Sequence, residues 1–172
     1  MKAFNIHRNV YVFTFPDGEF YMECSLARRW VVLASGFFDP PHRGHISYLR
    51  EAKKLGSWLV VSVHRDECCV KKKGYCFMPL EDRIAVVEAI RYVDEVIVCE
   101  PPCDLTTCNA LQKVKPQIFA KGGDRTPENM PLSEVKLCEN LGIEIVYGVG
   151  GGKVQSSSWL VEKCKAPTKP KK

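Results

Sequence analysis

The feature that most constrains the fold is a repeated alternation of short apolar runs with segments of helical periodicity. The run WVVLASG at residues 30–36 lacks polar alternation, as expected of a strand that is buried on both faces. It is followed by a helical pattern that ends at Gly56. This alternation predicts an α/β fold, a Rossmann-like five-stranded parallel sheet with helices on both faces. We expect strands at 30–36, 58–63, 95–100, 117–120 and 144–149, and helices at 45–56, 80–90, 105–114, 133–141 and 156–163.

The N-terminal residues stand apart from this alternation. Two β-rich runs, 9–15 and 19–24, flank the turn sequence Pro16-Asp17-Gly18, and this pattern predicts a β-hairpin. We therefore divide the chain into an N-terminal hairpin extension (1–29), an α/β domain (30–164) and a flexible Lys/Pro tail (165–172).

The net charge of +5 comes from the C-terminus. The last ten residues contain five lysines and no acid, whereas residues 1–162 contain 20 basic and 20 acidic groups. A neutral body argues against specific nucleic-acid binding, which normally uses basic residues spread over a folded face. No apolar stretch reaches the roughly 18 residues that a membrane span needs, and the N-terminus lacks a signal-peptide pattern. We expect a cytoplasmic protein without a membrane span.

The chain contains nine cysteines. No C-x-x-C motif occurs: Cys68 and Cys69 are adjacent, and Cys99, Cys103 and Cys108 follow intervals of four and five residues. This spacing does not favour a structural zinc site, so we expect mostly reduced, half-buried thiols.

The run GFFDPPHRGH at residues 36–45 directly follows the first strand of the alternation. Ligands of such folds bind beyond the carboxyl ends of the strands. His42 and His45 are three residues apart at the start of a helix, so both imidazoles can lie on one side, beside free backbone N–H groups and the positive end of the helix dipole. This arrangement suits a phosphate group, to which neutral imidazoles donate hydrogen bonds.

These residues resemble the nucleotidyltransferase superfamily, whose signature is H-x-G-H, here His42-Arg43-Gly44-His45. The Gly-x-Phe-Asp run ahead of it is similar to the cytidylyltransferase-like family, which includes heptose-1-phosphate adenylyltransferase domains and glycerol-3-phosphate cytidylyltransferases. The resemblance covers Val31 to Cys164 and rests on five separated elements in the right order. It implies that His42 and His45 are catalytic. It also implies nucleotide contacts by Gly36, Phe37, Phe38, Asp39 and Gly44.

Two further elements follow the second and third strands. After the second strand we expect a loop that contains Lys71-Lys72-Lys73-Gly74, followed by Pro79-Leu80-Glu81-Asp82-Arg83. The first run resembles a Lys-Gly pair of heptose-phosphate adenylyltransferases, and the second resembles their Pro-Leu-Glu-x-Arg element. The resemblance implies that Lys73 contacts the triphosphate. Those enzymes often carry Arg-Pro where this chain has Tyr75-Cys76-Phe77-Met78. The stretch RYVDEV at 91–96 is similar to one near the dimer contact and active site of glycerol-3-phosphate cytidylyltransferases. Candidate acceptor or dimer contacts are therefore Arg83, Arg91 and Asp94.

Two glycine-containing elements follow the last two strands. KGGD at 121–124 is typical of heptose-1-phosphate adenylyltransferases, and GGGKVQSSS at 150–158 precedes the last helix as a second phosphate cradle. Lys153 stands where cytidylyltransferases usually place an arginine, a change that keeps the charge and loses the bidentate fork. The implied nucleotide contacts are Lys121, Gly122, Asp124, Lys153, Ser156, Ser157 and Ser158.

The resemblance implies an enzyme that transfers a nucleoside monophosphate from an NTP to a phosphorylated small molecule and releases pyrophosphate. KGGD and PLEDR favour AMP and a sugar phosphate. RYVDEV favours the alternative, CMP transfer to glycerol 3-phosphate or a similar alcohol phosphate. A third hypothesis is an inactive nucleotide-binding regulatory module. Mg²⁺ is expected with the NTP, held by substrate and water rather than by protein side chains, with Asp39 as a contact through water. A homodimer is expected.

Overall fold

The computed structural model describes residues 2–7, 10–15, 18–23, 29–101, 104–123, 125–152 and 155–165. Its α/β domain is built on a five-stranded sheet in the order β6-β5-β4-β7-β8, in which every pairing is parallel. This confirms the predicted Rossmann-like α/β fold. The strands are β4 (Val31–Gly36), β5 (Trp58–Val63), β6 (Glu95–Val98), β7 (Ile118–Gly122) and β8 (Glu144–Val149).

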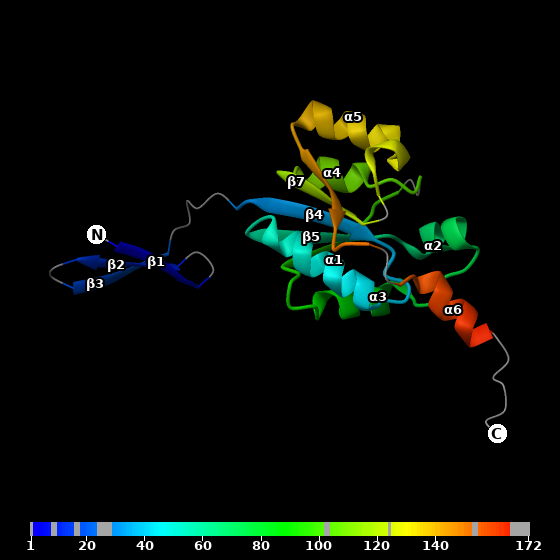
Figure 1. The fold of residues 1–172 in the computed structure, drawn as a ribbon, viewed down its shortest axis with the longest axis horizontal. Helices are drawn as coiled ribbons and strands as arrows, with labels where there is room; N and C mark the ends of the chain where they lie inside the picture. The colour runs from blue at the N-terminus through cyan, green and yellow to red at the C-terminus, as the bar shows by residue number, and fades with distance from the viewer. Residues whose placement is uncertain are drawn as a thin grey trace, which may run out of the picture.

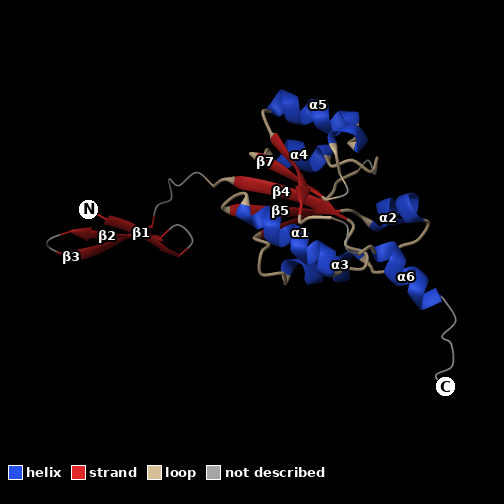
Figure 2. Ribbon diagram, in the orientation of Figure 1, coloured by secondary structure: helices blue, strands red, loops and turns tan. Residues whose placement is uncertain are grey.

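Helices cover both faces of this sheet (Figures 1 and 2). One face carries α1 (Arg43–Lys54) and α3 (Leu80–Glu88), and the other carries α4 (Cys108–Val114) and α5 (Leu132–Leu141). Alternate side chains of each strand supply the two cores: Val32 and Ala34 of β4 pack with α1, whereas Leu33 packs toward α4. The central strands β4, β5 and β7 are apolar without alternation because both of their faces are buried.

The crossing from β6 to β7 decides where a ligand can bind. From the central β4 the chain winds outward through β5 and β6, then crosses to β7 and β8 on the other side. The loops at the carboxyl ends of β4 and β7 therefore diverge and leave a crevice between them. The helix α6 (Ser157–Lys165) follows β8 beyond this same edge.

One prediction for this domain was wrong. The lysine run lies at the end of a helix, α2 (Asp66–Lys73), and not in a loop. Asp66 and Glu67 in its first turn and three lysines in its last turn suit the helix dipole, and Gly74 ends it with a left-handed φ of 81°. Acidic residues at the start of a segment and lysines at its end favour a helix, and the lysines alone did not reveal this pattern.

The N-terminal segment forms a separate antiparallel sheet in the order β1-β2-β3. Its strands are β1 (Lys2–His7), β2 (Val10–Phe15) and β3 (Gly18–Glu23). The predicted hairpin is present as β2 and β3, and β1 adds a third strand that was not predicted. Except for Lys165, the predicted tail lies outside the described residues.

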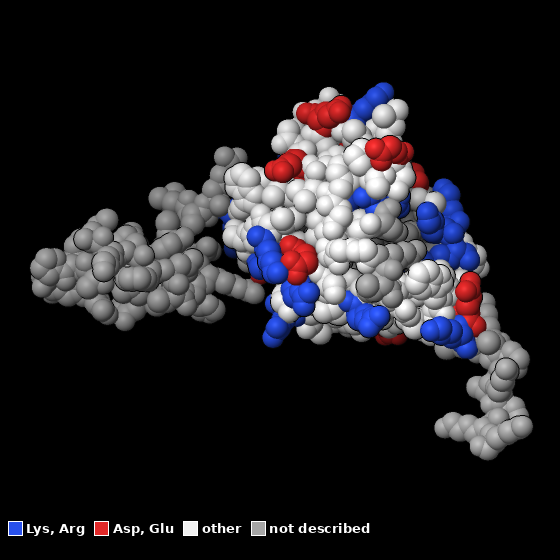
Figure 3. Space-filling view, in the orientation of Figure 1, with Lys and Arg blue, Asp and Glu red and all other residues white. Residues whose placement is uncertain are grey.

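On the face shown in Figure 3, Lys and Arg side chains are interspersed with Asp and Glu and do not gather in a single basic field. Within the described residues, no helix is both long enough and apolar enough to cross a membrane.

Candidate active site

A cavity of about 340 Å³ opens at the carboxyl ends of β4, β7 and β8. Most of the residues predicted for the site line it, and they come from five separated parts of the chain. The predicted residues that line the cavity are Gly36, Phe37, Phe38, His42, Gly44, His45, Lys73, Lys121, Gly122, Ser156, Ser157 and Ser158.

The two histidines of the H-x-G-H motif are stacked at the start of α1. Their ring centroids are 3.8 Å apart at an interplanar angle of 20°. His42 is the N-cap of the helix, and its Nδ1 accepts a hydrogen bond from the Gly44 amide at 3.2 Å. The Nδ1 of His45 accepts from the His42 amide, also at 3.2 Å. The motif thus forms a capping box from two imidazoles in place of the usual hydroxyl and carboxylate.

These contacts determine which ring nitrogens can face a ligand. Because both Nδ1 atoms accept backbone hydrogens, the proton of each neutral ring lies on Nε2. The pKa of His45 is lowered to about 3, mainly by burial and in smaller part by the neighbouring His42 and Lys73. At neutral pH His45 is therefore an uncharged ring with an Nε2–H donor, fixed at a helix N-terminus whose dipole favours an anion.

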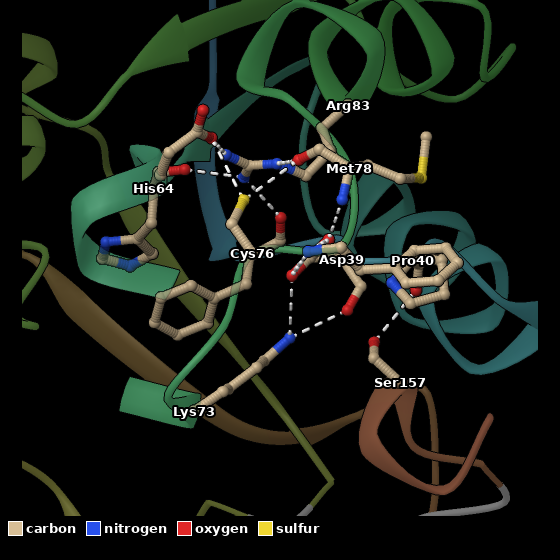
Figure 4. A network of polar contacts seen from close by, with 11 residues as sticks. Asp39, Pro40, His64, Lys73, Cys76, Met78, Arg83 and Ser157 are labelled. Carbon is tan, nitrogen blue, oxygen red and sulfur yellow. Dashed lines mark hydrogen bonds and ion pairs between the residues drawn. The ribbon is translucent and has the colours of Figure 1, made fainter. Parts of the chain in front are cut away.

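Lys73 ends α2 beside the histidine pair and lies over Phe37, with its Nζ 5.5 Å from the ring centroid. Its Nζ donates to the backbone carbonyl of Asp39 at 2.8 Å and lies 3.6 Å from the Asp39 carboxylate (Figure 4). The side chain is 14% exposed, so the ammonium group is held at the wall of the cavity by its neighbours. A phosphate could recruit it by a short side-chain movement.

Asp39 does not line the cavity. Its side chain is fully buried, and its carboxylate accepts hydrogen bonds from the amides of Phe77 and Met78 at 2.7–3.1 Å. The oxygens of Asp39 thus hold the segment after α2, and its contact with a nucleotide or a Mg²⁺-bound water stays a prediction.

Lys121 at the end of β7 belongs to a buried pair. Its Nζ lies 3.0 Å from an Oε atom of Glu134, and the other Oε accepts the Thr107 amide at 2.7 Å. Burial lowers the pKa of Lys121, and Glu134 opposes that shift. Both residues line the cavity, so the predicted cation is present with a carboxylate partner that the sequence did not indicate.

The glycine elements after β7 and β8 pack against each other and against α1. A Cβ on Gly123 would lie 1.7 Å from the carbonyl oxygen of Gly151, and one on Gly150 would lie 2.7 Å from the Cα of Tyr48. The start of α6 is tied to the motif loop because Ser157 Oγ donates to the Pro40 carbonyl at 2.9 Å. Glycine is required where these backbones touch, and the loops close one wall of the cavity.

Arg83 and Asp94 are both held inside the domain by internal partners. Arg83 is fully buried and donates to the carbonyls of Phe37, His64 and Met78 and to Asp66. The side chain of Asp94 is also fully buried, where it pairs with Lys53 and accepts the Leu59 amide. Both side chains are engaged by these internal partners, and their contact with an acceptor or a second subunit stays a prediction. Arg91 is exposed and stays a predicted contact, whereas Asp124 and Lys153 lie outside the described residues.

His64 is a cavity residue that the sequence analysis missed. It directly follows β5, is 4% exposed and stacks on Phe37 with ring centroids 4.6 Å apart. Among the described residues its Nδ1 has no hydrogen-bond partner. Burial lowers its pKa to about 4. The strand-end rule applied to the other strands would have found it, whereas no local signal marks Glu134, which lies within a helix.

The geometry agrees with what known proteins show. The profile of the cytidylyltransferase-like family matches residues 33–145, which run from β4 to the start of β8. The chain belongs to the cytidylyltransferase-like family. The match spans the H-x-G-H motif, α2 and KGGD, which line much of the cavity, and the chain is a nucleotidyltransferase of this family.

Individual relatives carry more specific names. A FAD synthase from Pyrococcus abyssi is 39% identical over 120 residues, which are 69% of this chain and 80% of that protein. The bifunctional protein HldE of Hahella chejuensis is 38% identical over 123 residues, or 70% of this chain and 23% of that protein. A lipopolysaccharide core biosynthesis protein from Thermoplasma volcanium has a TM-score of 0.59 at 30% identity and covers 70% of this chain and 95% of its own.

Proposed function

We propose that this protein transfers AMP from ATP to a small phosphomonoester and releases pyrophosphate. The observation that carries the proposal is the stacked His42–His45 pair, which lines the cavity at the N-terminus of α1 and whose Nδ1 atoms both accept backbone N–H groups. Two fixed neutral donors at a helix N-terminus stabilise charge that develops on phosphate oxygens.

In the proposed reaction, an oxygen of the acceptor phosphate attacks the α-phosphorus of ATP. A new P–O bond forms, the bond from the α-phosphorus to the bridging oxygen breaks, and the electron pair leaves with pyrophosphate. The acceptor oxygen is already ionised, so no general base is required, and catalysis is positioning and charge stabilisation. His42 and His45 donate to the phosphates, and Lys73 neutralises the leaving group. Mg²⁺, carried by the phosphate oxygens, would neutralise further charge.

The base and the acceptor are proposed from the relatives. FAD contains AMP joined through a pyrophosphate bridge, so the relative named FAD synthase supports adenylyl transfer to a phosphomonoester. The matched region makes up about a quarter of the length of HldE. This relative supports the same choice as the KGGD element, which is AMP transfer to a sugar phosphate. The alternative is CMP transfer to an alcohol phosphate such as glycerol 3-phosphate, favoured by the RYVDEV stretch.

The test is pyrophosphate release across four NTPs and three acceptors: FMN, a sugar 1-phosphate and glycerol 3-phosphate. We expect release only with ATP and with one of the first two acceptors, and no release in a His42→Ala/His45→Ala double variant. Preference for CTP with glycerol 3-phosphate would replace the proposal by its alternative. Nucleotide binding without release for any acceptor would instead identify a regulatory module.

A further inference from the structure

Three possible metal ligands meet behind the wall of the cavity. They are Cys69 in α2, Cys76 in the segment after α2, and Asp39 in the loop after β4. The two sulfur atoms and one carboxylate oxygen all lie within 4.8 Å of one another. Cys69 and Asp39 are buried, and Cys76 is half-buried. The spacing of the cysteines gave no sign of this group, because its third member is 30 residues away from the nearer cysteine in the sequence.

The separations are close to those of a tetrahedral thiolate site. With Zn–S bonds of about 2.3 Å, two sulfur ligands of one zinc ion lie about 3.8 Å apart, so contraction of about 1 Å or less would bring these atoms to bonding geometry. The sulfur of Cys76 also donates to Asp66 Oδ1 at 3.3 Å, so a second carboxylate lies beside the group.

The charges around the group also accommodate a divalent cation. Arg83 pairs with Asp66, and Lys73 lies beside Asp39, so the two carboxylates are balanced by two cations (Figure 4). Both cysteines are free thiols, and metal ligands of this type bind as thiolates. A divalent cation that displaces both thiol protons leaves the total charge of the cluster unchanged. Thiolates select zinc or cadmium over magnesium.

We propose that Cys69, Cys76 and Asp39 bind a thiophilic divalent cation such as Zn²⁺, at a site separate from the nucleotide cavity. The neighbouring Cys68 is disulfide-bonded and is not available as a ligand. A bound ion would cross-link α2, the segment that replaces Arg-Pro of the relatives, and the loop after β4. Because Lys73 lies between the two cysteines in the chain, the ion would stabilise the backbone that holds this lysine.

The experiment is a Zn²⁺ titration against a chromophoric chelator, in oxygen-free buffer without thiol reductant, followed by Cd²⁺ titration monitored by the thiolate-to-metal absorption band. We compare the wild type with Cys69→Ser and Cys76→Ser, and use Cys108→Ser and Cys138→Ser as matched controls at two other free thiols. Metal-free variants are first compared by circular dichroism and thermal melting. Cys69→Ala is a second variant should serine be poorly tolerated at this buried position.

We expect the wild type and both controls to bind one equivalent with release of about two protons, because both thiols must ionise. Loss of Cys69 or Cys76 should weaken that equivalent by roughly 100-fold or more, since even outer contacts of metal sites are worth up to about that factor. A wild type that binds no equivalent overturns the proposal. So does a titration in which the Cys69 and Cys76 variants bind as the controls do. Neither result depends on turnover, so the adenylyl-transfer proposal is unaffected.

Discussion

At the scale of single residues, the site depends on which atoms the backbone has already used. The Nδ1 of His45 accepts a hydrogen bond from the His42 amide in the helix cap, which fixes the ring, so replacing the ring removes one preorganised donor from the phosphates. We expect His45→Ala to reduce kcat on the order of 100-fold. Arg43→Ala is the control, because this exposed residue lies between the histidines and does not line the cavity. Pyrophosphate release measures both, and an unchanged kcat in His45→Ala would contradict the assigned role.

The lysine run provides a second test, because its members lie in different places. Lys73 and Lys72 line the cavity, and Lys71 does not. The Lys73 ammonium is held beside Asp39, where it can turn to a triphosphate, and a hydrogen bond between charged groups contributes about 1.5–3 kcal/mol. We expect Lys73→Ala to raise KM for ATP and lower kcat, about tenfold or more in kcat/KM.

Lys71→Ala is the matched control for this measurement, with an equal charge change on the same helix. Steady-state kinetics at fixed acceptor concentration compares the two. A larger loss in Lys71→Ala than in Lys73→Ala would show that the wrong lysine was chosen within the run.

Residue roles were predictable where the motif fixes the backbone, and not where packing decides. Gly36, His42 and His45 line the cavity because a strand end and a helix start determine their position. Asp39 belongs to the same motif, yet its carboxylate turns inward to the amides of Phe77 and Met78, which are nearly forty residues away. No local pattern contains that information.

At the scale of elements, Arg83 is the connection between α3 and the site. Its guanidinium bonds the carbonyls of Phe37, which lines the cavity, of His64 at the end of β5, and of Met78 before α3. Lysine keeps the charge but cannot make these bonds at once. We expect Arg83→Lys to lower the free energy of unfolding by about 3 kcal/mol, as when a buried charged network loses a partner.

Urea denaturation measures that loss, and Arg91→Lys, an exposed arginine just beyond the end of the same helix, is its control. Equal midpoints for the two variants would mean that the buried network contributes little. The resemblance identified the arginine but assigned it to an acceptor or a dimer contact. The sequence could not show its burial, since burial depends on how α3 packs under the loops of β4 and β5.

Element types were predictable over most of the domain, and the exceptions have physical reasons. The five strands were found because burial on both faces removes polar residues from them. Helix α2 was missed because its lysine run suggested a solvated loop, although the acids at its start and Gly74 at its end are helix signals. Its eight residues have little hydrophobic periodicity, since the buried Cys68 and Cys69 are adjacent.

At the scale of the whole molecule, the buried histidines make stability depend on pH. In the folded protein the pKa of His45 is lowered to about 3 and that of His64 to about 4, mainly by burial, from an ordinary value of 6.5. Between about pH 6.5 and pH 4 the unfolded chain therefore binds protons that the folded protein does not. Stability must fall as the pH falls through this window, by up to about 1.4 kcal/mol per pH unit for each histidine.

The carboxylates also titrate in this range, so the prediction is a difference between two variants. His64→Gln removes one of the two histidines whose pKa is lowered. Between pH 6.5 and pH 4 the free energy of unfolding of this variant should fall less steeply than that of the wild type, by up to about 1.4 kcal/mol per pH unit, because one proton fewer is taken up on unfolding. Urea midpoints measured at half-unit steps give both slopes. The absolute stability of the variant is immaterial, because only the slope reports proton uptake. Parallel curves would mean that His64 is already charged, or exposed to solvent, in the folded protein.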